Sequence, residues 1–391
     1  MPTRISGTLE RQDTHGLAGI LSGAPSSRAV PRRVLMTADG VGGVWPCTLD
    51  LASGLAARGV EVTVAVMGPP LLDHQLAEAA RRGLALIEGG YALEWMDNPW
   101  NDVDAAGEWL LGLERTTAPD LVHLNGFCHA ALPWRAPTVV AGHSCVRSWW
   151  LAVHGVEAPP QWARYTERVA EGLRAATLVV APSAAMLSAL EAEYGPLGPA
   201  RVIPNGLAHV RRSDTTAAKQ DLVFSAGRIW DDAKNIEALC AVASSLPWPV
   251  AVAGDRQGPH GPCAPTAGVN SLGQLPREGV QAWYDRAGIY VLPARYEPFG
   301  LSVLEAAAAG CALVLGDIRS LRENWHGAAV FVPPDNRRAL AAAIRELSAD
   351  PERRHTLAQA AAGRASTFTL NRMVAGYLDA YRSLTPVAVH Q

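Results

Sequence analysis

The strongest constraint on the fold is a repeated alternation between short, apolar, β-branched runs and longer segments of helical pattern. The first series of such runs occupies residues 34–37, 61–66, 121–123, 138–141 and 178–181. Runs that are apolar at nearly every position are typical of strands buried on both faces of a parallel sheet. The first half of the chain therefore predicts one parallel sheet with helices on both sides.

A polar stretch at residues 211–216 interrupts this alternation, which restarts with apolar runs at 222–226, 249–253, 289–292 and 312–315. A chain of 391 residues also exceeds the usual size of a single hydrophobic core. The fold class is thus α/β, with two doubly wound, Rossmann-like domains that face a central cleft. Ligands of such sheets bind beyond the carboxyl ends of the strands.

The predicted domain organisation has four parts. Residues 1–31 form a flexible extension, residues 32–208 the first domain and residues 218–369 the second. A last helix at about 370–391 packs back on the first domain. Its apolar residues recur at helical spacing: Phe368, Met373, Tyr377, Tyr381 and Leu384.

Composition and charge exclude several classes of function. The net charge of −3 provides no field of one sign that would attract nucleic acid. The six cysteines are scattered without a C-x-x-C pair, which argues against a disulfide framework or a zinc site. There is no apolar run of membrane-spanning length and no secretory signal, so we expect a cytoplasmic protein. Only two of the 34 Lys and Arg residues are Lys, which is typical of high-GC bacterial genomes.

Two acidic residues flank a turn that opens a helix. Glu297 lies in the loop and Glu305 in the helix, separated by Pro298, Phe299, Gly300 and Leu301 among others. Two carboxylates at such a junction can accept hydrogen bonds from sugar hydroxyls, while free N–H groups at the helix start favour a phosphate. The alternative is that Ser302 and Glu305 form a capping box, which needs no ligand.

Two cations follow the first strand of the second domain. Arg228 can hold phosphate oxygens with two parallel hydrogen bonds, and Lys234 adds a compact charge. The alternative is that both are solvated surface residues. The position of Lys234 favours function, because it is one of only two lysines in the chain.

The first strand of the chain ends in a glycine-rich loop at residues 39–43. Gly42 and Gly43 would let the backbone approach a phosphate or sugar closely. A dinucleotide-binding fingerprint would need a third glycine where Trp45 stands and an acidic residue where Met67 and Gly68 stand. The dehydrogenase interpretation therefore fails, and a plain tight turn remains the alternative.

Residues 296–310, with their Glu-x7-Glu spacing, closely resemble the signature of the GT-B glycosyltransferases of retaining family 4 (glycosyl transferases group 1). The resemblance covers about residues 32–385. It implies that Glu297 contacts the transferred sugar and that Glu305 holds the nucleotide ribose. Arg228 and Lys234 resemble the family's pair that binds the donor diphosphate, although their spacing departs by one residue from the commonest form.

The resemblance extends to the loops of the first domain. Gly42 and Gly43 resemble the loop that approaches donor and acceptor. His143 follows the run at 138–141 and resembles the family's active-site histidine, which makes His143 and Glu297 the candidate catalytic residues; a structural histidine is the alternative. His123 resembles another recurrent histidine, and a role in the core is equally plausible for it.

In the second domain, Gln274 and Leu275 resemble the loop that brackets the nucleotide base. The other donor-site candidates are the residues that open the helix after Glu297, namely Phe299, Gly300 and Leu301.

The predicted reaction moves a hexosyl group from a nucleotide diphosphosugar to a hydroxyl-bearing small molecule or carbohydrate, with retention of configuration. UDP is favoured, with GDP and ADP possible. No Asp-x-Asp motif stands in a fitting place, so we expect a metal-independent enzyme without a cofactor. Candidate acceptor-side residues are Trp45, Asn125, Trp149 and Trp150, for which core packing is the alternative. The sequence leaves the oligomeric state open. A nucleotide-sugar epimerase, a phosphorylase-like enzyme and a non-catalytic sugar-nucleotide-binding module remain alternative functions.

Overall fold

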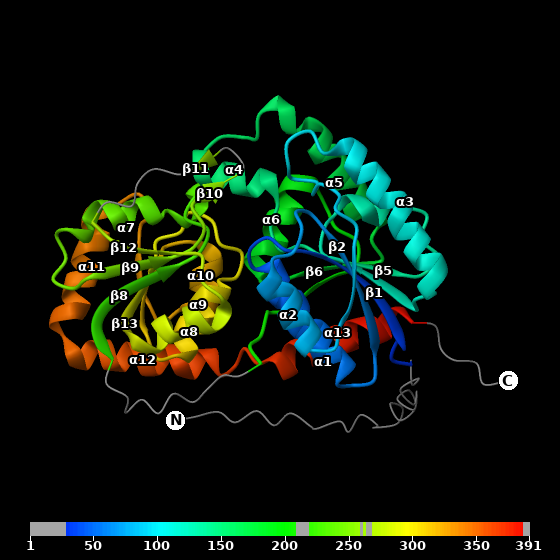
Figure 1. Cartoon of the computed structure of the whole chain (residues 1–391). Coiled ribbons are helices and arrows are strands. Elements are labelled where there is room, and N and C mark those ends of the chain that lie inside the picture. The colour runs from blue at the N-terminus through cyan, green and yellow to red at the C-terminus, as the bar shows by residue number, and fades with distance from the viewer. Residues whose placement is uncertain (1–28, 209–218, 259–260, 263–267, 386–391) are drawn as a thin grey trace, which may run out of the picture.

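The computed structural model describes residues 29–208, 219–258, 261–262 and 268–385, which form two α/β domains side by side (Figure 1). Most of the predicted extension at 1–31, the polar stretch at 211–216 and residues 386–391 lie outside this range. No helix within it is both long and apolar enough to cross a membrane.

The first domain is built on seven parallel strands in the order β3-β2-β1-β4-β5-β6-β7. Its strands are β1 (Arg33–Asp39), β2 (Glu61–Met67), β3 (Ala85–Glu88), β4 (Leu121–Leu124), β5 (Thr138–Ala141), β6 (Leu178–Ala181) and β7 (Ala200–Val202). Its helices are α1 (Val44–Ala56), α2 (Asp73–Arg81), α3 (Trp100–Thr117), α4 (Val146–His154), α5 (Ala163–Ala175) and α6 (Ala184–Tyr194), with short 3-10 turns η1 (Cys128–Ala131) and η2 (Pro160–Trp162).

The second domain has six parallel strands in the order β12-β9-β8-β13-β14-β15, and a separate hairpin of β10 with β11. The strands are β8 (Gln220–Ala226), β9 (Val250–Ala253), β10 (Gln257–Gly258), β11 (Gly261–Pro262), β12 (Asn270–Gly273), β13 (Ala287–Leu292), β14 (Ala312–Gly316) and β15 (Val330–Val332). The helices are α7 (Ile236–Ala243), α8 (Arg277–Arg286), α9 (Leu301–Ala308), α10 (Arg319–Trp325), α11 (Arg337–Ala349) and α12 (Pro351–Ala365), preceded by the 3-10 turn η3 (Asp232–Lys234). A last helix, α13 (Leu370–Leu384), follows them.

Each sheet is buried on both faces, as the continuous apolar runs predict. Along β1, Val34 and Met36 enter one core and Leu35 enters the core on the opposite face. Along β8, Phe224 and Val223 divide in the same way. The prediction of two doubly wound domains is confirmed.

The last helix, α13, packs on the first domain beside α1, and the red and blue ribbons in Figure 1 lie against each other. Its buried face includes Met373, Tyr377 and Tyr381, the residues whose spacing predicts the helix. The chain thus passes between the domains twice. The two passes are joined where Leu207 N donates to Phe368 O and Leu370 N donates to Leu207 O.

Candidate donor and acceptor site

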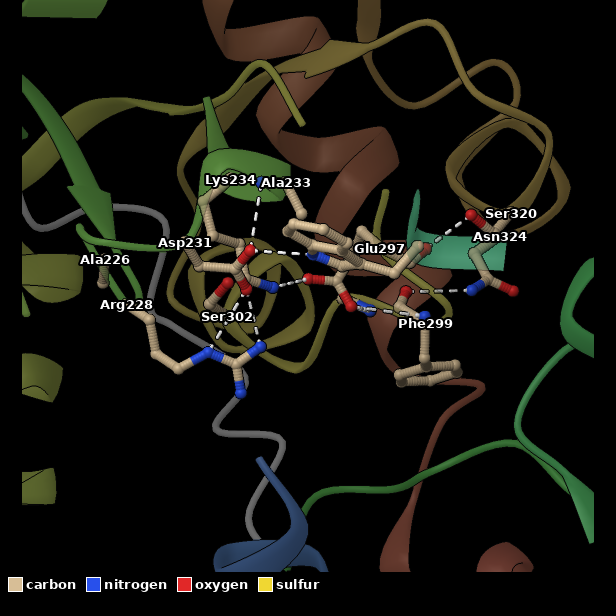
Figure 2. Close-up of polar contacts among 12 residues, drawn as sticks. Ala226, Arg228, Asp231, Ala233, Lys234, Glu297, Phe299, Ser302, Ser320 and Asn324 are labelled. Carbon is tan, nitrogen blue, oxygen red and sulfur yellow. Dashed lines mark hydrogen bonds and ion pairs between the residues drawn. The ribbon is translucent and has the colours of Figure 1, made fainter. Parts of the chain in front are cut away.

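The loop that carries Glu297 is held rigidly by side chains from both domains. Three consecutive carbonyl oxygens, those of residues 297, 298 and 299, accept hydrogen bonds from Ser320 Oγ (2.5 Å), Ser183 Oγ (2.6 Å) and Asn324 Nδ2 (3.1 Å), respectively. Ser320 and Asn324 belong to α10, whereas Ser183 precedes α6 of the first domain (Figure 2 shows the α10 contacts). With its carbonyls fixed in this way, the loop orients the Glu297 side chain before any ligand arrives.

Glu297 and Lys234 form a direct ion pair in the second domain. Lys234 Nζ lies 2.5 Å from Glu297 Oε2, and Gly300 N donates to Oε1 at 2.9 Å. The side chains are only 16% and 12% exposed. Burial alone raises the pKa of Glu297, but Lys234 and the N–H groups of Phe299 and Gly300 outweigh it and hold the pKa below its ordinary value. Glu297 is therefore ionised at neutral pH.

Arg228 lies beside this pair and reaches the first domain. Its Nη2 and Nε donate to Asp231 Oδ2 at 2.7 and 3.3 Å (Figure 2). Its Nη1 lies so close to Gly42 that a Cβ on that glycine would be 2.5 Å away. Gly43 similarly approaches Leu301, the first residue of α9. The glycine loop after β1 thus meets both the Arg228 guanidinium and the start of α9.

Helix α9 is not capped by the predicted alternative. Its N-cap is Gly300 with φ +91°, and no side chain caps it. The Ser302 hydroxyl lies inside the helix and bonds the Tyr290 hydroxyl at 2.8 Å, so the capping box with Glu305 is wrong. Contrary to the prediction from the sequence, the N–H groups of Phe299 and Gly300 are not free for a phosphate, because they donate to the Glu297 carboxylate.

Glu305 lies where charges of the two domains meet. Burial raises its pKa, Asp50 adds to this effect, and Arg277 and the Tyr284 hydroxyl oppose it. Arg277, on α8, binds both carboxylate oxygens of Asp50 on α1, at 3.3 and 3.1 Å. Glu305 is therefore next to an ion pair that links the domains.

In the first domain, His143 and Asn125 are in contact. Asn125 Nδ2 donates to Thr37 O at 2.6 Å, so its Oδ1 is the acceptor for His143 Nε2 at 2.7 Å. This arrangement places the proton of the imidazole on Nε2 and leaves Nδ1 as an acceptor. Burial lowers the pKa of His143 to about 4, which keeps the ring neutral at physiological pH.

Several predicted residues lie elsewhere. Trp45 is 3% exposed and belongs to the hydrophobic core that α1 and α13 share, so the prediction that it faces an acceptor is wrong. It lies on the apolar face of α1, which is buried in this core. His123 is buried in β4, where Nδ1 bonds the Tyr381 hydroxyl at 2.6 Å, which agrees with a core role. The Phe299 ring is buried and packs against Phe368, so the residue contacts Glu297 with its backbone N–H and not with its ring.

The remaining candidates lie at two further places. Gln274 is exposed and Leu275 half-buried after β12, the edge strand beside β9. Trp149 and Trp150 form an aromatic cluster with His154 on α4, with ring centroids 4.6–5.7 Å apart. The Trp149 indole N–H crosses to the second domain and donates to Asp231 Oδ1 at 3.0 Å.

Two family models match consecutive parts of the chain. The model of Glycosyltransferase Family 4 matches residues 41–211, and that of Glycosyl transferases group 1 matches residues 210–364. The chain belongs to the group 1 glycosyltransferases of family 4. It is therefore a GT-B enzyme that transfers sugar from a nucleotide sugar, as the Glu-x7-Glu segment predicts.

Individual relatives agree with this assignment. The glycogen synthase of Mycobacterium tuberculosis is 27% identical over 372 residues, which cover 82% of this glycosyltransferase and 86% of the relative. Among solved structures, sucrose-phosphate synthase of Thermosynechococcus elongatus has a TM-score of 0.73 at 20% identity, over 90% of this chain and 99% of its own. Anabaena HepE, in complex with UDP and glucose, has a TM-score of 0.70 at 17% identity over 90% and 100% of the two chains. These two structures show the shared fold.

Sequence reasoning missed part of the site of this glycosyltransferase. Asp231 and Arg277 contact residues of both halves, and Ser183 holds the Glu297 loop. Ser183 lies two residues after the carboxyl end of β6, so its position near a strand end could have marked it. No local pattern distinguishes the other two.

Proposed function

We propose that this glycosyltransferase transfers a hexosyl group from a UDP-sugar to a hydroxyl acceptor, with retention of configuration and without a metal ion. The observation that carries the proposal is the convergence of Arg228, Lys234 and the start of α9 at the carboxyl ends of β8 and β13, against the glycine loop of the first domain. Cations and backbone N–H groups placed where a diphosphate departs can stabilise its developing charge.

The two cations retain donors for a diphosphate although both are paired. Arg228 uses one edge of its guanidinium for Asp231, and Nη1 points towards the glycine loop. Lys234 has three N–H bonds, and its contact with Glu297 uses one. Among the described residues, no group of three or more His, Cys, Asp or Glu side chains could hold a metal ion. The two cations are the groups we assign to the role of the metal.

The reaction breaks the bond between the anomeric carbon and the β-phosphate oxygen, and forms a bond from that carbon to the acceptor oxygen on the same face of the sugar. The acceptor proton moves to the departing diphosphate. Glu297 is unsuited to be a covalent nucleophile, since Lys234 and the Gly300 N–H already hold its two carboxylate oxygens. We assign to it hydrogen bonds with the sugar hydroxyls, and to neutral His143 a contact through Nδ1.

UDP is favoured because HepE, which shares the fold, was solved with UDP and glucose. The test is a thermal-shift panel of UDP, GDP and ADP with their glucose and mannose conjugates, followed by NMR assignment of the anomer formed in donor hydrolysis. We expect stabilisation by UDP above the other two, and α-configured product from an α-linked donor. An inverted product would overturn retention, and activity abolished by EDTA would overturn metal independence.

A nucleotide-sugar epimerase is the competing function. It would convert the donor alone into an isomeric sugar nucleotide, which the same NMR spectra detect as new anomeric resonances with the diphosphate still attached. Release of free UDP and sugar supports transfer instead.

A further inference from the structure

One buried carboxylate binds a donor-site cation, Arg228, and a tryptophan from the other domain, Trp149. Asp231 has a side chain only 3% exposed. Its Oδ2 receives the Arg228 guanidinium, and its Oδ1 receives Ala233 N and Trp149 Nε1, each at 3.0 Å (Figure 2 shows the first two partners). Both oxygens are thus occupied, by partners from both domains.

Asp231 also begins the turn that carries Lys234. It is the N-cap of η3, and Lys234 N donates to Asp231 O at 2.8 Å. The far end of this turn is fixed by Asn235, whose Nδ2 donates to Pro293 O and Pro334 O at 2.9 and 2.8 Å. The backbone that presents Lys234 is therefore fixed at both ends.

The contact with Arg228 decides which edge of the guanidinium is presented. Since Nε and Nη2 are bound to Asp231, the planar group cannot rotate, and Nη1 is directed at Gly42. Burial alone raises the pKa of Asp231, but the charges of Arg228 and Lys234 and the hydrogen bonds from Arg228 and Trp149 together hold it below its ordinary value, so the pair stays ionised.

We propose that Asp231 is a positioning residue of the donor site, which fixes the edge that Arg228 presents to the diphosphate and, through Trp149, couples that edge to helix α4 of the first domain. The inference rests on the proposed function, because it assigns the diphosphate to Arg228. Asp231 itself touches no substrate. A change in the aromatic cluster on α4 therefore reaches the donor site through one indole N–H bond.

The test is the affinity of the full chain for UDP, measured by calorimetry, or for GDP or ADP if the panel shows that one of them binds instead. Asp231→Asn retains an oxygen for Trp149 and Ala233 but turns an N–H₂ group towards Arg228. We expect at least about a 10-fold loss of affinity, the scale of a charge-assisted hydrogen bond. The matched control is Asp232→Asn at the exposed neighbouring position, which removes the same charge and should alter affinity less than about 2-fold.

A double-variant cycle separates positioning from a merely structural role. In an Arg228→Ala background, Asp231→Asn should cause no further loss of affinity and should restore part of the melting temperature, since the buried carboxylate has already lost its cation. Trp149→Phe should weaken binding about 3-fold alone and not at all in the Asp231→Asn background.

If Asp231→Asn binds the nucleotide with wild-type affinity, the inference about Asp231 is overturned while the proposed function stands. The same holds if Asp231→Asn still lowers the affinity in the Arg228→Ala background. A wild-type protein that binds none of the three nucleoside diphosphates would overturn the proposed function and this inference together.

Discussion

Asp39, the last residue of β1, should make the stability of this glycosyltransferase fall as the pH rises. The residue is 8% exposed, and its side chain accepts a hydrogen bond from Val41 N at 2.8 Å. Burial raises its pKa from 3.8 to about 6; the Val41 N–H and Arg228 oppose this rise, and Glu94 adds to it. The folded state therefore holds this proton at pH values where the unfolded chain has released it.

The sign and size follow from proton linkage. A raised acid pKa contributes stability that is complete below pH 3.8 and is lost as the pH rises to about 6. With these two values the loss is about 1 kcal/mol at pH 4.5 and about 3 kcal/mol at pH 7.5, a difference of about 2 kcal/mol. Asp39→Asn keeps the acceptor for Val41 N but cannot ionise, so it should gain about 2 kcal/mol over wild type between these pH values.

The assay is urea unfolding followed by tryptophan fluorescence at pH 4.5 and 7.5, with the exposed Asp221→Asn as the control for loss of one charge. His143, whose pKa is lowered to about 4, has the opposite effect: its stability contribution is lost as the pH falls below 6.5. This effect is common to both proteins and cancels in their difference. If the stability gap between Asp39→Asn and wild type is the same at both pH values, the buried-carboxyl argument is refuted.

Two further predictions concern the first-domain loops. Gly42→Ala should lower UDP affinity at least about 10-fold by calorimetry, because φ is +66° and the new Cβ would lie 2.5 Å from Arg228 Nη1. Gly59→Ala, at φ +81° with open space around it, is the control for backbone strain. Equal losses of affinity in the two variants would contradict the reasoning. Asn125→Asp places a carboxylate against His143 Nε2 and should raise the histidine pKa, so the acid limb of the pH profile of donor hydrolysis should move up by about one pH unit or more. An unmoved limb would remove His143 from the reaction.

The interior strands could be predicted from the sequence, and the edge strands could not. Each predicted run matches a strand that has neighbours on both sides, from β1 to β14. Besides the short hairpin of β10 and β11, the missed strands are β3, β7, β12 and β15, which are the four edges of the two large sheets. An edge strand is partly solvated, as the half-buried residues of β3 show, and so lacks the continuous apolar run by which a buried strand is recognised.

The same reasoning explains which site residues the sequence revealed. Arg228 and Glu297 lie in the loops that follow β8 and β13. Adjacent parallel strands such as these bring their carboxyl ends together whatever the loops contain. Orientation is another matter. The Glu297 loop is held by Ser183, 115 residues from Pro298, whose carbonyl it contacts, and Asp231 meets Trp149 across 82 residues. Such pairs depend on how two separately folded sheets dock, for which local periodicity carries no information. Motifs therefore predict which groups reach a site, while the docking of the domains decides which edge of each group faces the substrate.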